Sequence, residues 1–179
     1  DGWIDIYAAV DFDPNLLWIN QGDNTFVDTA VSAGADNSMN DMGMALGDYD
    51  GDGDLDIYVS NIYIAAENKY SVLYRNDTVA GVPAFTEVAV AAGVDDCSWG
   101  WGATFLDADN NGDLDLAATN GYRVNPYYTD QSRLFYNNAD SPVTFTDIAA
   151  SAGFDDSFWG FTLIAFDYDR DGDLDTLQT

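Results

Sequence analysis

Aspartate recurs at alternate positions in three nine-residue loops along this 179-residue chain. The loops are DYDGDGDLD at 48–56, DADNNGDLD at 107–115 and DYDRDGDLD at 167–175. Carboxylates spaced in this way on a tight loop can converge on one point, which suits the roughly six to eight oxygen ligands that Ca²⁺ takes. The spacing therefore predicts about three full calcium sites.

Each position of the loop has an expected role. Side chains at positions 1, 3, 5 and 9 are predicted to bind the metal, whereas position 7 is expected to contribute its backbone carbonyl. Glycine at position 6 permits the sharp turn. The predicted metal residues are Asp48, Asp50, Asp52, Asp54, Asp56, Asp107, Asp109, Asn111, Asp113, Asp115, Asp167, Asp169, Asp171, Asp173 and Asp175, with Asp1 and Asp5 in a partial fourth site.

Other interpretations of the loops fit less well. Mg²⁺ is the weaker alternative because it retains waters and demands a stricter octahedron. An EF-hand would place glutamate at position 12, where this chain has Val59, Ala118 and Gln178. Ordinary acidic turns are disfavoured because four or five acids within nine residues would repel one another without a cation.

The charge of the whole chain also favours cations as partners. The 32 acidic residues face 5 basic residues and no histidine, which gives a formal net charge of -27. Nucleic acid and anionic membranes would be repelled. The chain contains no apolar run of 18 residues, so no membrane span is expected. The lone Cys97 cannot form an internal disulfide and is expected to be a buried structural thiol.

The usual catalytic constellations are absent from the sequence. It has no histidine and no Gly-rich phosphate loop. The pairs Asp95–Asp96 and Asp155–Asp156 are not expected to act as acid and base, because glycosidase carboxylates face each other across the substrate and neighbouring loop residues diverge. The chain is therefore predicted not to be an enzyme.

The loops are landmarks of a longer repeat, because they follow one another at spacings of 59 and 60 residues. An Ala-rich stretch in each unit ends at a glycine and is expected to form one helical turn. The predicted repeat region is 1–179, with approximate blades 1–47, 48–106 and 107–166 and a further blade opening at 167–179.

Four segments of the second unit predict strands, at 55–60, 72–76, 85–88 and 101–106. Four antiparallel strands in a repeat of this length are typical of propeller blades. The predicted fold class is all-β, with three four-stranded antiparallel propeller-type blades plus an extra strand. Closed propellers need about four to eight blades, so we expect the chain to be part of a larger or oligomeric β-propeller-like assembly.

These motifs resemble FG-GAP or VCBS repeats, the blades of integrin α-subunit propellers and of many bacterial secreted proteins. Met42–Gly43 and Trp101–Gly102 look like the family's Phe-Gly element, whereas the third unit has Phe161–Thr162 there, which puts a tight backbone approach in doubt. The order Leu-Tyr-Arg-Asn, Phe-Thr-Glu-Val and Ala-Ala-Gly is similar to the subgroup that contains cartilage acidic protein. The resemblance implies structural Ca²⁺, an extracellular location, and adhesion or ligand binding.

The number of strands that the chain crosses after a metal loop, odd or even, predicts which connections share a face; we call this strand parity. From a metal loop the chain crosses the blade once, so 61–71 and 120–132 should lie opposite the loops, together with 93–100 and its equivalents 34–41 and 153–160. Trp99 and Trp159 occupy equivalent positions, which favours packing for them, while Tyr127 and Tyr128 are not repeated. The candidate ligand-face residues are Tyr63, Lys69, Trp99, Tyr122, Arg123, Tyr127, Tyr128 and Trp159, beside the two acidic pairs.

Three functions are compatible with these features. The favoured one is an extracellular, calcium-binding, non-catalytic module for adhesion or recognition of a protein or glycan ligand. The alternatives are a structural subunit that self-assembles through open blade edges, or the accessory propeller of a secreted polysaccharide-acting enzyme. Asn76 begins a glycosylation sequon, but it matches Asn20 and Asn137 in the repeat, which favours a structural role at a strand end.

Overall fold

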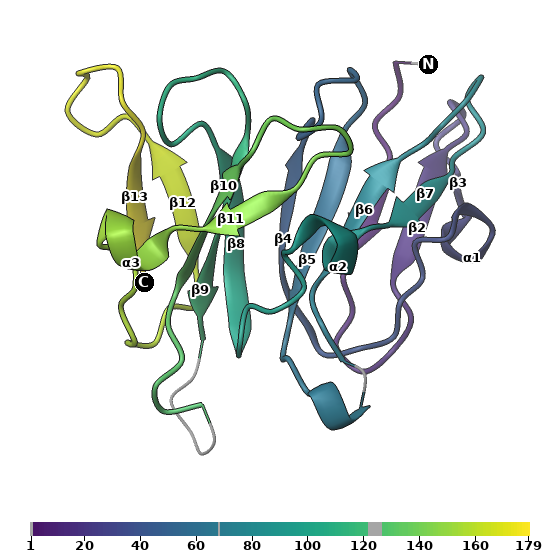
Figure 1. The fold of residues 1–179 in the computed structure, drawn as a ribbon. Helices are drawn as coiled ribbons and strands as arrows, with labels where there is room; N and C mark the ends of the chain where they lie inside the picture. The colour runs from purple at the N-terminus through teal and green to yellow at the C-terminus, as the bar shows by residue number, and fades with distance from the viewer. Residues whose placement is uncertain (1, 68, 122–126) are drawn as a thin grey trace.

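The computed structural model describes residues 2–67, 69–121 and 127–179 (Figure 1). Short strands predominate, and each helix is a single turn. In chain order the elements are β1 (Ile6–Ala8), β2 (Leu16–Asn20), β3 (Phe26–Asp28), α1 (Ala30–Ala33), β4 (Asp41–Gly47), β5 (Asp56–Asn61), the 3₁₀ helix η1 (Ala65–Glu67), β6 (Val72–Asn76), β7 (Phe85–Glu87), α2 (Ala89–Ala92), β8 (Gly100–Leu106), β9 (Asp115–Asn120), β10 (Arg133–Asn137), β11 (Phe145–Asp147), α3 (Ala149–Ala152), β12 (Leu163–Phe166) and β13 (Asp175–Gln178).

In the part of the chain that the structure describes, the strands form separate antiparallel sheets that stand side by side (Figure 1). The sheets are β1-β2-β3, β4-β5-β6-β7, β8-β9-β10-β11 and β12-β13. Neighbours in each sheet are consecutive in the chain, so every sheet is a simple meander. The predicted all-β fold with four-stranded, propeller-type sheets is confirmed.

The sheets begin one strand earlier than the predicted units. Strand β4 pairs with β5, and β8 pairs with β9, across the metal loops. The boundaries predicted at 47/48 and 106/107 therefore fall inside hairpins. The reason is that each loop is the turn between the first two strands of its sheet, so a unit counted from the loop assigns the first strand to the preceding blade.

The Ala-rich stretches form the three one-turn helices, as predicted. Helices α1, α2 and α3 end at Gly34, Gly93 and Gly153, which adopt the left-handed conformation with φ of 76°, 80° and 74°. The buried alanines of each turn pack the helix against its own sheet. Each helical turn thus follows the last strand of one sheet and precedes the first strand of the next.

Glycines in the first strands let adjacent sheets approach closely. A Cβ on Gly43 would lie 1.9 Å from the Trp101 carbonyl oxygen, and one on Gly102 would lie 2.7 Å from the Leu163 nitrogen. The hydroxyls of Ser60 and Thr119 donate to carbonyls of the neighbouring sheet. A side chain at position 43 or 102 would clash with the neighbouring backbone, so glycine is needed at both positions for the next blade to pack this closely.

The core lies between the sheets, and Cys97 is part of it. Its thiol is buried and lies 2.6 Å from the Tyr58 hydroxyl, and burial raises the pKa of the thiol to about 11. The prediction of a buried thiol is confirmed. None of the described helices has the length and apolar character needed to cross a membrane.

Candidate metal centres

The three Asp-rich loops connect β4 to β5, β8 to β9 and β12 to β13, at one edge of the sheets (top of Figure 1). The carboxylates at positions 1, 3 and 9 meet in each loop, with one oxygen from each within 4.8 Å of the others. These groups are Asp48, Asp50 and Asp56, then Asp107, Asp109 and Asp115, then Asp167, Asp169 and Asp175.

Backbone N–H groups hold the first carboxylate of each loop. In the loop 48–56, the N–H of Asp52 donates to Oδ1 of Asp48 (3.1 Å), and the N–H of Gly53 donates to Oδ2 (3.0 Å). Gly53 has φ of 96°, a conformation that glycine adopts without strain. The bond from position 6 to position 1 recurs in the other two loops, at 3.0 and 3.2 Å.

The position-9 carboxylate is held between two strands. Asp56 accepts hydrogen bonds from the N–H groups of Tyr49 (3.1 Å) and Asn76 (2.8 Å). Asp115 is held in the same way by Ala108 and Asn137. Burial raises the pKa of Asp56 to about 7 against the opposing effect of these hydrogen bonds. A buried carboxylate with acidic neighbours is costly, and a divalent cation would offset that cost.

The asparagine at the end of the third strand clamps the loop. Nδ2 of Asn76 donates to the Leu55 carbonyl (3.0 Å), and its Oδ1 accepts from the N–H of Thr78 (3.0 Å). Asn20 and Asn137 make the equivalent bonds to position 8 of their own loops. This is the structural role predicted for the strand-end asparagines, although their contact with the metal loop was not foreseen.

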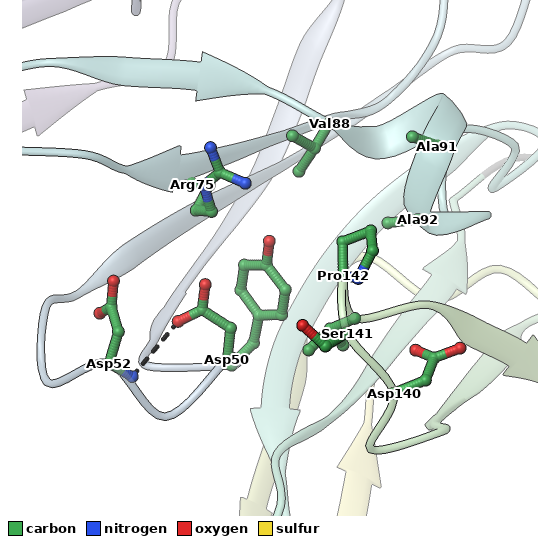
Figure 2. Close-up of a pocket in the computed structure, with 11 residues that line it drawn as sticks. Asp50, Asp52, Arg75, Val88, Ala91, Ala92, Asp140, Ser141 and Pro142 are labelled. Carbon is green, nitrogen blue, oxygen red and sulfur yellow. Dashed lines mark hydrogen bonds between the residues drawn. The ribbon is translucent and has the colours of Figure 1, made fainter.

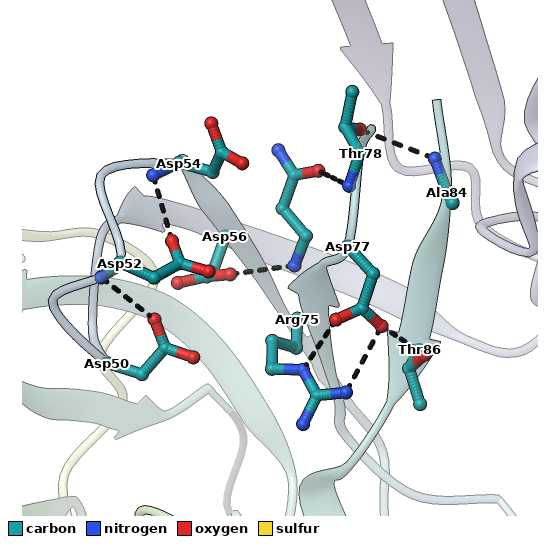
Figure 3. Close-up of polar contacts among 10 residues, drawn as sticks. Asp50, Asp52, Asp54, Asp56, Arg75, Asp77, Thr78, Ala84 and Thr86 are labelled. Carbon is teal, nitrogen blue, oxygen red and sulfur yellow. Dashed lines mark hydrogen bonds and ion pairs between the residues drawn. The ribbon is translucent and has the colours of Figure 1, made fainter. Parts of the chain in front are cut away.

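The donor set suits a hard cation. Every side chain that the loop 48–56 directs inward offers carboxylate oxygen, which matches the ligand preference of Ca²⁺. Asp52 is not one of these three carboxylates, and its Oδ1 accepts the N–H of Asp54 at 2.9 Å (Figure 3). In the partial loop, Asp5 accepts the N–H of Asn20 at 2.8 Å, and Asp1 lies outside the described residues.

Residues 1–59, which contain the first sheet and the loop 48–56, match the model of the FG-GAP-like repeat family. This part of the chain is similar to an FG-GAP-like repeat. A stretch of 58 residues is 47% identical to cartilage acidic protein 1 of Mus musculus, 45% to that of Homo sapiens and 43% to that of Xenopus tropicalis. This stretch is 32% of the chain and spans only 9% of the length of these relatives. The predicted resemblance is confirmed.

A pocket of about 550 Å³ lies where the FG-GAP-like loop 48–56 meets the following sheet (Figure 2). Asp50 and Arg75 line one side, while Pro142 of the β10–β11 connection lines the other. Arg75 is held by Asp77, with Nε 2.9 Å from Oδ1 and Nη2 3.2 Å from Oδ2 (Figure 3). The metal loop is therefore bordered by the next blade and does not stand free.

Connections from adjacent sheets meet at the edge opposite the metal loops (bottom of Figure 1). The N–H of Tyr63 donates to the Ser98 carbonyl (2.8 Å), and that of Gly121 donates to the Trp99 carbonyl (2.8 Å). The hydroxyl of Tyr127 donates to the carbonyl of Tyr63 (3.2 Å). Strand parity thus correctly groups these connections on one face.

The candidate ligand-face residues differ in their surroundings. Trp99 packs edge-on against Tyr127, with ring centroids 4.9 Å apart, whereas Tyr128 and Trp159 are 54% and 51% exposed. Lys69 forms an ion pair with Glu67 (3.3 Å). Tyr122 and Arg123 lie outside the described residues.

The acidic pairs on this face stabilise turns. The carboxylate of Asp96 accepts the N–H of Ser98 (2.8 Å), and that of Asp156 accepts the N–H of Phe158 (2.9 Å). The carbonyl of Asp155 accepts a hydrogen bond from the Gln131 side chain (2.7 Å). These bonds give the pairs a structural role.

Proposed function

We propose that this chain is an extracellular, calcium-binding module of FG-GAP-like repeats that recognises a protein or glycan ligand and is not catalytic. The observation that carries the calcium part is the recurrence of three carboxylates within 4.8 Å of one another in three loops of equal geometry. A formal net charge of -27 makes cation binding more favourable still. The similarity to cartilage acidic proteins supports an extracellular role.

In this proposal Ca²⁺ stiffens one edge of the blades, and the ligand meets the other edge. Side chains at positions 1, 3, 5 and 9 and the carbonyl at position 7 would hold the ion, and the ion would neutralise part of the loop charge. The exposed Tyr128 and Trp159 on the opposite face are the candidates for ligand contact. Aromatic rings there can stack on sugars or on apolar side chains of a protein.

Calcium titration by calorimetry and native mass spectrometry tests the metal part. We expect about three ions per chain, with Kd of about 0.1 to 1 mM, as is typical of extracellular modules, and weaker binding of Mg²⁺. The matched variants Asp48→Asn and Asp107→Asn should each remove one ion. Finding all three loops empty in millimolar calcium would refute this part of the proposal.

The recognition part is tested by binding to immobilised glycans and extracellular-matrix proteins in calcium. Tyr128→Ala should weaken binding to any ligand found, whereas Tyr168→Ala, at the metal-loop edge, should not. Equal loss with both variants would place the ligand elsewhere. Hydrolysis of a polysaccharide by this chain alone would contradict the non-catalytic assignment.

A second candidate function is a structural subunit of a calcium-stabilised assembly. It is favoured by the exposed apolar side chains of the sheet β12-β13, which include Ile164, Phe166 and Leu177. Such a face promotes association with further blades. Sedimentation velocity discriminates between the two functions, because a monodisperse monomer at high concentration argues against assembly.

A further inference from the structure

The side chain of Asn137 contacts two metal loops at once. Its Nδ2 donates to the carbonyl of Leu114 in its own loop (3.1 Å) and to the carbonyl of Tyr49 in the preceding loop (3.0 Å). Its backbone N–H donates to Oδ1 of Asp115 (2.8 Å). Asn137 is 1% exposed, so water competes little for these bonds.

Three hydrogen bonds therefore join two of the expected metal ligands. Asp115 accepts from the N–H of Asn137, Asn137 donates to the carbonyl of Tyr49, and the N–H of Tyr49 donates to Asp56 (3.1 Å). Asp56 and Asp115 are both buried. The path thus passes through two residues only, and it joins the position-9 carboxylates of adjacent blades.

The aromatic packing around Tyr49 makes this path stiff. The Tyr49 ring stacks on Phe105, with centroids 6.4 Å apart, and it contacts Phe145 at 5.8 Å. Phe105 belongs to β8, the strand that leads into the loop 107–115. The Tyr49 ring cannot rotate freely to absorb a shift of one loop, because it packs against Phe105 and Phe145 of the next sheet.

We propose that Asn137 is a positioning residue that couples the loops 48–56 and 107–115, so that Ca²⁺ bound in one loop strengthens binding in the other. The inference rests on the proposed calcium binding. A metal in the loop 107–115 fixes Asp115 and hence Asn137, which leaves less ordering to be done when the second ion binds near Asp56. The expected coupling is about fivefold in affinity, the low end for coupled sites.

Nuclear magnetic resonance can report the two loops separately. The N–H groups of Gly53 and Gly112 each donate to the position-1 carboxylate of their own loop at 3.0 Å, so each amide signal should shift when that loop binds metal. In Asp109→Asn, which weakens the loop 107–115, the Gly53 signal should need about two to five times more calcium for half of its shift, with the full factor reached if the loop 107–115 fills first. Asp50→Asn should raise the midpoint of the Gly112 titration as well, and the two fold-changes multiplied together should give about five, because the coupling free energy is reciprocal.

Asn137→Ala tests the path, and Asn76→Ala is its matched control. Both variants lose the clamp to position 8 of their own loop, and neither changes the net charge. Among the described residues, Nδ2 of Asn76 is bonded to Leu55 alone, whereas Asn137 also reaches the preceding loop. The effect of Asp109→Asn on Gly53 should therefore vanish in the Asn137→Ala background and persist in the Asn76→Ala background.

The outcomes separate this inference from the proposed function. If Gly53 titrates at the same calcium concentration in the wild type and in Asp109→Asn, and Gly112 does so in the wild type and in Asp50→Asn, calcium binding stands and the coupling is refuted. If coupling survives in Asn137→Ala, it does not pass through Asn137. If neither glycine responds to millimolar calcium, the calcium binding itself fails. Should Asn137→Ala not fold, the reciprocal pair Asp109→Asn and Asp50→Asn still decides whether the loops are coupled.

Discussion

The loops 48–56 and 167–175 have nearly the same sequence but very different surroundings. Both have tyrosine at position 2, yet Tyr49 is 5% exposed and Tyr168 is 78% exposed. Two backbone bonds recur, because the N–H of each tyrosine donates to the position-9 carboxylate, at 3.1 and 2.9 Å, and the position-6 N–H donates to the position-1 carboxylate in both loops. The shape of the loop is thus local, whereas its burial depends on the blade that follows.

Burial changes the electrostatics of the two loops. Asp56 is buried beneath the next sheet, and burial raises the pKa of its carboxyl to about 7, whereas Asp175 is exposed. Within residues 1–179, the position-9 carboxylate is therefore buried in the loop 48–56 and exposed in the loop 167–175. A bound cation should matter to packing between sheets at the first site and to local order at the second.

Removal of calcium should have the largest effect. A loop held at 100 times its Kd, which is about 10 mM calcium for a Kd of about 0.1 mM, contributes about 2.7 kcal/mol, and each kcal/mol shifts Tm by about 2–4 °C in a domain of this size. Chelation of three loops should therefore lower Tm by more than about 10 °C, measured by calorimetry at constant ionic strength. Hydrogen exchange should show the sheet β12-β13 opening first. An unchanged Tm would show that the loops hold their shape without metal.

Truncation of the two position-2 tyrosines should separate the loops most clearly. Tyr49→Ala removes a ring packed between Phe105 and Phe145 and should cost about 3–5 kcal/mol, as for other buried aromatic residues. Tyr168→Ala should change stability by about 0.5 kcal/mol or less. Urea unfolding in calcium measures both. Similar costs would mean that Tyr168 is also covered in solution.

Truncation at position 5 should instead affect the two loops equally. Asp52→Ala and Asp171→Ala each remove a predicted oxygen ligand, and each carboxylate bonds the N–H two residues later, at 2.9 and 3.0 Å. Calcium affinity of the altered loop should fall by about tenfold in both variants, since affinity follows ligand charge and number. Calorimetric titration would show unequal losses if burial, and not local geometry, set the affinity.

The local structure could be predicted from the sequence because it depends on residues that lie close together in the chain. Alternate aspartates, glycine at position 6 and the Ala-Ala-Gly stretch each fix backbone shape within a few residues. The repeat then extended these predictions along the chain. The loops alone did not predict at which strand each sheet begins, because a hairpin turn belongs equally to the strands before and after it.

Long-range contacts of the site could not be predicted in the same way. The bond from Asn137 to Tyr49 spans 88 residues, and it depends on how closely two sheets pack. The regular recurrence of asparagine at the strand end was the available signal, but it predicted a structural role without a partner. Burial of Asp56 likewise arises from the neighbouring sheet, so the nearly identical motif did not predict that Asp175 would be exposed.

The smallest effect is expected at position 7, where only the backbone carbonyl should bind metal. Asp54→Ala should change calcium affinity by less than about twofold, because its side chain is exposed and only its backbone carbonyl is predicted to bind the metal. Asp173→Ala should have a slightly larger effect, since its Oδ1 accepts a hydrogen bond from Asn110 of the adjacent loop (2.6 Å). That bond is exposed and should contribute about 0.5–1 kcal/mol. A tenfold loss in Asp54→Ala would instead make the position-7 carboxylate a ligand, and the loop would then bind Ca²⁺ with one more charge than its geometry indicates.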